Sequence, residues 1–192
     1  MLDHALTFFK EELSHYIKIK TAGQKEDHVQ FPEIQLPKEL IMQNNAITLL
    51  VVNLEEERTF RSSTTTVSKR PTSNALTDGS HLDLNFHLLA IANFQDYSEG
   101  LKMLSLVLKF FRSYRLFSPQ AFPALPAEIP QLSTELVNLS FMEQSELWRS
   151  LEIPCSPSAL YKVRLLIFPD TDIEPSTLAT AASAMQTDFS RL

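Results

Sequence analysis

Residues 97–117 carry the sequence YSEGLKMLSLVLKFFRSYRLF, and the rest of the chain is organised around them. Lys102, Ser105, Lys109 and Arg112 recur at spacings that place them in one stripe along a helix of 3.6 residues per turn. Between Leu101 and Phe111, all the other side chains are large and apolar. A helix with so much apolar surface needs cover on more than one side, from a sheet of its own chain and from a second helix or another subunit.

Local signals predict where this helix begins and ends. Ser98 is a candidate N-cap, because its hydroxyl can accept a backbone N–H of the first turn. Glu99 suits the positive end of the helix dipole, whereas Arg112 and Arg115 suit the negative end. Pro119 follows as a stop signal. Lysine and arginine interrupt the apolar run too often for it to span a bilayer, so we expect no stable membrane insertion.

Strand patterns occur on both sides of this helix along the chain. Residues 46–54 are rich in β-branched side chains and apolar on both alternating faces, which is typical of a central strand. Leu82–Phe94 begins with strict alternation of apolar and polar residues, which also favours a strand. A short edge strand is indicated within residues 29–36. The predicted sheet is mainly antiparallel, with four to five strands that include residues 46–60, 82–94, 131–139 and 160–168.

Two further helices are predicted. Apolar residues between positions 3 and 20 recur on one helical face. Ser140 and Glu143 form a capping-box pattern that opens a short helix over residues 141–151. The fold class is therefore predicted to be α+β, with the sheet packed by a long central helix and two further helices. The core-facing residues of the short helix are predicted to be Phe141, Leu147, Trp148 and Leu151.

The remaining segments are polar or rich in proline. Residues 61–81 form a long polar segment, and a loop of this length is usually disordered or used for binding. Within it, Lys69 and Arg70 are either a contact to an acidic partner or a solvated pair. Residues 119–130 contain four prolines and predict an extended linker.

The C-terminal stretch is small and polar and has few apolar anchors. Leu178, Phe189 and Leu192 are among them, and they are too sparse to build a core of their own. The stretch is therefore either an arm that docks on a neighbour or a disordered end. We expect one α+β domain over residues 1–168 and a C-terminal tail or docking arm over residues 169–192.

Composition excludes several classes of function. The chain has 192 residues, of which 44% are hydrophobic and 21% are charged, as is ordinary for a soluble globular protein. Its net charge of −6 argues against general nucleic-acid binding, which usually needs a basic excess. With Cys155 as the one cysteine, there is no disulfide framework and no cysteine-rich metal site. The three glycines are too scattered to form a phosphate-binding loop.

Candidate catalytic groups are sparse. The carboxylates of Glu55–Glu57 are adjacent, but successive strand residues point to opposite faces and do not converge on one site. His87 with Asp83 and Asn85 forms a polar cluster on one strand face, and the alternative is a solvent-facing polar row. Cys155 has no histidine close to it in the sequence to act as a base. We therefore expect no metal and no cofactor, and an enzyme using His87 or Cys155 is the less favoured alternative.

Three stretches carry a family resemblance: VVNLEEERTFRS (51–62), LDLNFHLLAIANFQDYSEGLKMLSLVLKFFRS (82–113) and LVNLSFMEQSELWRSLEIPCSPSALYKVRLLIF (136–168). Together they resemble the tail-terminator, or cap, proteins of contractile injection systems of the antifeeding-prophage type. The resemblance covers roughly residues 3–168. One departure is Glu152–Cys155, where the family pattern suggests a turn that contains glycine.

The resemblance implies a fold similar to phage tail terminators and a structural, non-enzymatic role. Such proteins form a ring on the end of the inner tube and sheath, which ends tube growth and anchors the last sheath layer. A six-fold ring is implied, because tube and sheath are six-fold. The implied partners are other copies of this chain, the inner-tube protein and the sheath protein, with no nucleic acid. Because the N-terminus shows no secretory pattern, we expect cytoplasmic synthesis followed by incorporation into the contractile particle.

Partner binding is predicted for charged groups on strands or loops and for apolar groups of the tail. The resemblance suggests that the tail docks either as a strand added to a sheath sheet or as a short helix over residues 176–189. A monomeric adaptor that binds one protein partner remains an alternative to the ring. The predicted partner-binding residues are Lys69, Arg70, Lys162, Arg164, Leu178, Phe189 and Leu192.

Overall fold

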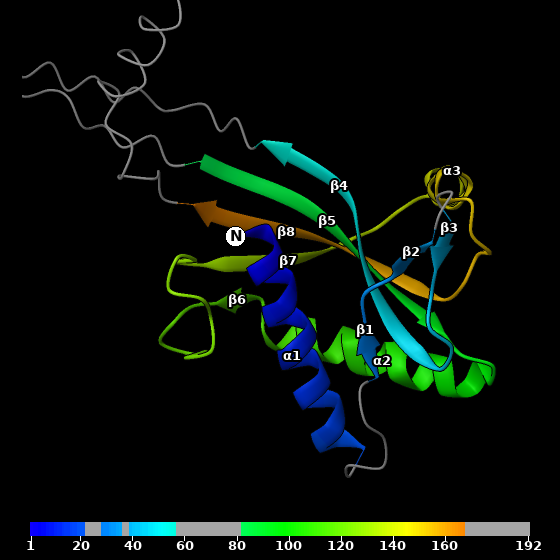
Figure 1. Ribbon diagram of the computed structural model, residues 1–192, viewed down its shortest axis with the longest axis horizontal. Coiled ribbons are helices and arrows are strands. Elements are labelled where there is room, and N and C mark those ends of the chain that lie inside the picture. Colours follow the sequence, from blue (N-terminus) through cyan, green and yellow to red (C-terminus); the bar gives the residue numbers. More distant parts are fainter. Residues whose placement is uncertain (22–27, 36–38, 57–81, 168–192) are drawn as a thin grey trace, which may run out of the picture.

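The computed structural model describes residues 1–21, 28–35, 39–56 and 82–167, which form an α+β fold of helices around a curled sheet (Figure 1). This confirms the predicted fold class. The described helices are α1 (Leu2–Lys20), α2 (Tyr97–Ser113) and α3 (Phe141–Leu151). The strands of the main sheet are, in spatial order, β1 (Val29–Gln30), β4 (Ala46–Glu56), β5 (Leu82–Asn93), β8 (Ser158–Ile167), β7 (Leu132–Val137) and β6 (Leu116–Phe117).

The sheet differs in detail from the predicted antiparallel sheet of four to five strands. It has six strands among the described residues, and it is mixed because β1 runs parallel to β4 while every other pair is antiparallel. The strand that was not predicted is β6, which is only two residues long. A strand of two residues carries no alternation of its own, so a sequence pattern does not reveal it.

The predicted edge strand over residues 29–36 is divided into two elements. Its first part is β1, and its second part is β2 (Glu33–Gln35), separated by Phe31 and Pro32. β2 pairs with β3 (Glu39–Ile41) in a two-stranded sheet of its own. Proline cannot donate a ladder hydrogen bond, which explains the break at this point.

The central helix is shorter than predicted at its C-terminal end and capped by a different residue. It ends at Ser113, and Tyr114 is extended, with φ −122° and ψ 90°. The next residues, Leu116–Phe117, form β6 rather than a last helical turn. The N-cap is Asp96 and not Ser98, because the Asp96 carboxylate accepts the backbone N–H of Ser98 at 2.9 Å.

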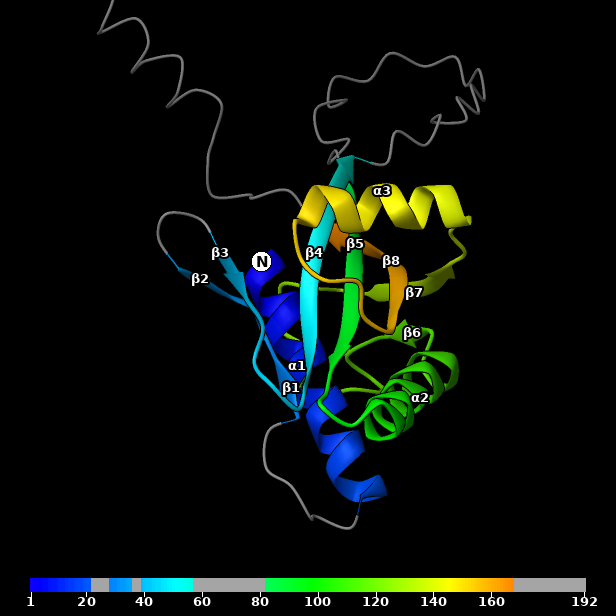
Figure 2. The same cartoon turned by 90° about the vertical axis from the view of Figure 1, so that its right-hand side faces the viewer.

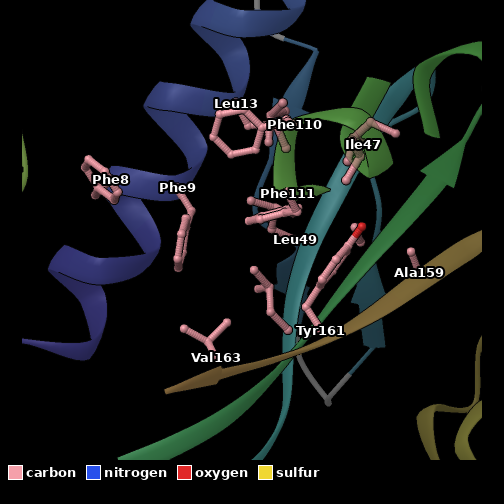
Figure 3. Close-up of a cluster of buried hydrophobic side chains, with 14 of the residues drawn as sticks. Phe8, Phe9, Leu13, Ile47, Leu49, Phe110, Phe111, Ala159, Tyr161 and Val163 are labelled. Atoms are coloured by element: carbon pink, nitrogen blue, oxygen red, sulfur yellow. The ribbon is translucent and has the colours of Figure 1, made fainter. Parts of the chain in front are cut away.

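One face of the sheet, which we call the α1/α2 face, holds a dense aromatic core (Figure 3). Phe9 of α1 packs edge-on against Phe111 of α2 and Phe117 of β6, with ring centroids 5.6 and 5.2 Å apart. Phe111 in turn contacts Tyr161 of β8 at 4.4 Å. Because these four side chains are almost fully buried, the helices and the sheet are fixed to each other across this layer.

The opposite face of the sheet is covered by α3, which crosses the strands (Figure 2). As predicted, Ser140 and Glu143 form a capping box and Trp148 is buried, at 6% exposure. Leu147 and Leu151 are half-buried beside it. The prediction for Phe141 is wrong, because this side chain is 92% exposed. Phe141 is the first residue of α3, and Figure 2 shows that α3 reaches beyond β4 and β5 at one end.

The proline-rich crossing is not helical, as predicted, but it is folded into turns rather than extended. Phe122 donates its backbone N–H to the Ser118 carbonyl, and Ile129 bonds back to Pro126. Leu125 and Ile129 are buried in the α1/α2 core. The predicted loop over residues 61–81 and the predicted tail lie outside the described residues.

Candidate interaction surfaces

Part of the α3 face carries polar side chains instead of apolar ones. Paired residues of neighbouring strands share a face, so the register places the polar positions of four strands in two adjacent rows. We call the residues of both rows together the polar row. Its members are Glu135, Lys162, His87 and Asn53 in one line and Ser133, Arg164, Asn85 and Glu55 in the next.

The polar row contains the cluster that was the best candidate for chemistry. His87 Nδ1 lies 4.0 Å from the Glu55 carboxylate, too far for a hydrogen bond, and the His87 side chain is 18% exposed. Asn85 is buried two residues away on the same strand face. The Asp83 side chain, the third member of the predicted cluster, is outside the description. Within the described part of the chain, no group of three or more His, Cys, Asp and Glu side chains could hold a metal ion.

Two of the predicted partner-binding residues also lie in the polar row. Lys162 is half-buried and is flanked on the neighbouring strands by Glu135 and His87. Arg164 is exposed. Cys155 is exposed on the segment between α3 and β8. The other predicted partner-binding residues, namely Lys69, Arg70, Leu178, Phe189 and Leu192, lie outside the described residues.

Sequence reasoning missed a surface at the β7 border of the sheet. A cavity of about 160 Å³ opens there between α2 and β7. We call it the β7 groove. A second cavity, of about 270 Å³, continues around the end of β7 toward α3, and Leu108 and Leu136 line both cavities. The residues of the β7 groove are Leu108, Phe111, Arg112, Arg115, Thr134, Glu135, Leu136 and Tyr161.

The backbone of β7 is open beside this groove. β6 pairs only with Leu132 and Ser133, and the N–H of Thr134 donates to the Arg115 carbonyl at 2.9 Å. Residues i and i+2 of a strand direct their backbone groups to the same side, so the N–H and C=O of Leu136 also point away from β8. No described backbone group pairs with them there. Leu132, Thr134 and Leu136 recur at every second position, which predicts a strand. This spacing does not reveal which edge of that strand is open.

The opposite border of the sheet carries the β2–β3 hairpin. Figure 2 shows this hairpin standing away from β4, on the side opposite β5. Among the described residues β2 pairs only with β3, and its central residue Ile34 is 76% exposed. Glu33 is exposed next to it, and Glu55 and Glu56 are exposed at the far end of β4. This border is therefore acidic, whereas the β7 groove is lined by Arg112 and Arg115.

None of the helices in the described ranges has the length and apolar character that crossing a membrane requires. The apolar surface of α2 is instead used within the protein. Met103, Val107 and Phe110 are buried in the core, and Leu106 is partly buried against it. Leu101 and Leu108 remain exposed on the helix.

The chain matches a family model and is similar to solved structures. The Pvc16 N-terminal domain profile matches residues 5–181, which is most of the chain. A comparison with curated proteins found no match. Among solved structures, the chain is similar to the sheath/tube terminator, in the extended state, of the extracellular contractile injection system PVC. The identity is 14% and the TM-score is 0.48, over 82% of this chain and 56% of that chain, so this chain spans little more than half of that protein's length.

Proposed function

The chain belongs to the Pvc16 N-terminal domain family, and from that premise we propose that it is a structural cap protein of a contractile injection system. In this proposal, copies of the chain form a ring on the end of the inner tube and sheath. The ring ends tube growth and anchors the last sheath layer. The family match over residues 5–181 is the observation that carries the proposal, and it agrees with the resemblance seen in the sequence.

The distribution of exposed groups supports an assembling protein. A ring of identical subunits uses heterologous interfaces, in which two different surfaces of each subunit meet. The chain offers an acidic border at β4 and a border with two arginines at β7, on opposite sides of one sheet. Exposed apolar side chains, among them Phe141 and Met142 at the start of α3, supply further contact area.

The polar row is proposed to bind the tube or sheath protein. Lys162 and Arg164 place two cations on a sheet face that α3 leaves open, which suits an acidic surface. Replacing both by alanine should weaken co-purification with tube and sheath proteins, more strongly at low salt than at high salt. The matched control replaces the exposed Lys18 and Lys20 of α1 by alanine. If the two double variants retain tube and sheath proteins equally well, the polar row does not bind these proteins.

The tail is proposed to be a docking arm for a neighbouring protein. Truncation after Asp170 should leave the melting temperature of the isolated protein nearly unchanged and should weaken co-purification with sheath or tube. If the truncated protein unfolds, the tail is part of the core. If it still caps particles normally, residues 169–192 are not an arm.

Electron microscopy of particles made without this protein tests the cap role itself. We expect tubes and sheaths of uncontrolled length, or sheaths that contract early, and we expect the gene supplied in trans to restore uniform particles. Uniform particles that contract normally in the deletion strain would exclude a terminator. A protein that stays monomeric at all concentrations and on particles would favour the adaptor instead.

A further inference from the structure

The open edge at the β7 groove is short and closed at one end. Arg115 and β6 occupy the edge of β7 as far as Thr134, and the chain leaves the strand for α3 after Val137. The free edge therefore spans Glu135–Val137, with the outward backbone groups of Leu136 at its centre. An added strand can run beside β7 for about three residues before it meets Arg115.

The side chain of Leu136 marks the face that such a strand would cover. Leu136 is paired with Tyr161 of β8, which is in the α1/α2 core, so Leu136 lies on that face of the sheet. It is 46% exposed, and Leu108 of α2 is exposed beside it across the cavity. An apolar side chain at the centre of an added strand would therefore enter an apolar space lined by Leu108, Phe111 and Tyr161.

The β2–β3 hairpin has the complementary properties. It is a two-stranded sheet separate from the main sheet, and such hairpins are marginally stable without further cover. β2 is three residues long, has β3 as its one partner in the described part of the chain, and carries the exposed Ile34 at its centre. Its length and its single apolar side chain match the free edge at Glu135–Val137.

We propose that β2 of one copy adds to the open edge of β7 in a second copy. The proposal rests on the ring proposed above and names the contact that would build it. Ile34 lies opposite Leu136 and enters the β7 groove, and the main-chain groups of the two strands complete each other's hydrogen bonds. The free edge of β7 and the free edge of β2 are both covered in this way.

Charge decides the direction of the added strand. In a parallel arrangement Glu33 would lie opposite Glu135, and two carboxylates directly opposite each other destabilise a strand pair. In the antiparallel arrangement Gln35 lies opposite Glu135 and donates its amide N–H to the carboxylate, while Glu33 lies opposite Val137. The added strand is therefore antiparallel to β7.

The charges of the two borders also attract each other over a longer range. The border that carries β2 exposes Glu33, Glu55 and Glu56. The border that receives it exposes Arg112 and Arg115, with Glu135 as the single acidic group among the residues that line the groove. Opposite charge on two approaching surfaces orients them before contact, so association should weaken as salt is raised.

The two contact surfaces lie on opposite borders of the sheet, so the interface is heterologous. Each copy gives a hairpin to one neighbour and receives a hairpin from the other. The repeated operation closes into a ring when the rotation allows it, which is the form that a cap requires. A pair of copies related by a two-fold axis does not satisfy this arrangement, because β2 and β7 are different elements.

Cysteine cross-linking tests the contact in the full-length protein. The background replaces Cys155 by serine, which removes the natural thiol. Ile34→Cys and Leu136→Cys are then introduced singly and together, because opposite residues in a strand pair have the spacing that a disulfide needs. Under mild oxidation we expect the double variant to form a ladder of covalent oligomers that ends at one closed species.

The single variants separate this contact from others. Each alone should give no cross-link, and an equal mixture of the two should stop at covalent dimers. Cross-linking of a single variant with itself would show a two-fold contact and would overturn the proposal. Light scattering of the Cys155→Ser background under reducing conditions, with and without tube protein, reports whether a ring exists at all. If light scattering shows a ring but the double variant forms no covalent ladder, only the β2–β7 contact is wrong. If the protein is a monomer with and without tube protein, the proposed ring is wrong as well.

A charged substitution gives an independent check without new disulfides. Leu136→Lys and Ile34→Lys should each lower the fraction of oligomer at least tenfold, because each buries an unpaired ammonium at the contact. Ile19→Lys is the matched control, since Ile19 is an exposed isoleucine on α1 outside the proposed contact. Oligomers of all three variants with equal stability would contradict the proposal. Circular dichroism of each variant confirms that the monomer is folded.

Discussion

The two faces of the sheet differ in how completely they are covered. The α1/α2 face is packed by two helices and a layer of aromatic rings, most of them fully buried. The α3 face has one short helix, one buried tryptophan and an adjoining polar row. The first face holds the fold together, and the second leaves surface for other molecules. Stability and assembly are therefore expected to respond to different substitutions.

The largest expected effect comes from the aromatic layer. Phe9→Ala removes a fully buried ring that packs edge-on against Phe111 and Phe117. We expect the free energy of unfolding to fall by about 4 kcal/mol, because the loss of transfer energy adds to the cost of a cavity. Urea unfolding followed by circular dichroism measures it. If an alanine substitution in α3 lowers the free energy of unfolding more than Phe9→Ala does, the α3 face contributes more to stability than the α1/α2 face, contrary to this account.

Trp148→Ala is expected to cost less, about 3 kcal/mol. Trp148 is buried against Leu89, Ile91 and Leu160, but it also borders the cavity of about 270 Å³, so its surroundings can relax. α3 is too short to be stable without this contact. Loss of α3 from the sheet should appear as faster hydrogen exchange in α3, with α1 still protected. An unchanged melting temperature would mean that the tryptophan contributes little to the covered part of this face.

Alkaline pH should lower the stability of the protein through Tyr161, which is buried on the α1/α2 face. Burial raises the pKa of the Tyr161 hydroxyl above its usual range. Above about pH 10 the unfolded chain loses this proton while the folded chain keeps it, so the free energy of unfolding falls as pH rises. We expect Tyr161 to lower the free energy of unfolding by about 1.4 kcal/mol for each pH unit in this range. Tyr161→Phe should make the decline of stability with pH shallower, and identical slopes for variant and wild type would refute this assignment.

The smallest expected effect concerns the cap of α3. Ser140 accepts the backbone N–H of Glu143, and the Glu143 carboxylate accepts the backbone N–H of Ser140 at 2.8 Å. Ser140→Ala should cost about 1 kcal/mol. The Ser140 backbone N–H and the Ser140 hydroxyl both donate to the Glu143 carboxylate and lower its pKa, so this stabilisation is present at neutral pH and lost as acid protonates the carboxylate. A Ser140→Ala penalty that is the same at neutral and acid pH would argue against the reciprocal cap.

Elements with a long periodic pattern could be predicted from the sequence. The pattern of α2, the alternation at the start of β5 and the Ser140–Glu143 cap all predicted structure that is present. Leu116–Phe117 was assigned to the predicted helix, for which Pro119 was the stop signal. The extended backbone at Tyr114 and pairing with β7 moved it into the sheet, and a sequence does not display pairing between distant segments.

The interaction surfaces were harder to predict than the fold. Lys162 and Arg164 were identified as a charged strand face, and register then placed them beside residues of the two neighbouring strands, β5 and β7. The β7 groove depends on which edge of β7 remains open, and the exposure of Phe141 depends on where α3 crosses the sheet. Both are properties of tertiary arrangement, so neither leaves a local pattern in the sequence.

Cryo-electron microscopy of the intact particle tests the cap role most directly. The account predicts a ring of this domain at one end of the tube, in contact with the last layers of tube and sheath. In that ring, β2 of each copy should lie beside β7 of its neighbour, with the polar row turned toward tube or sheath. Density for this domain along the length of the tube, or its absence from both ends, would contradict the account.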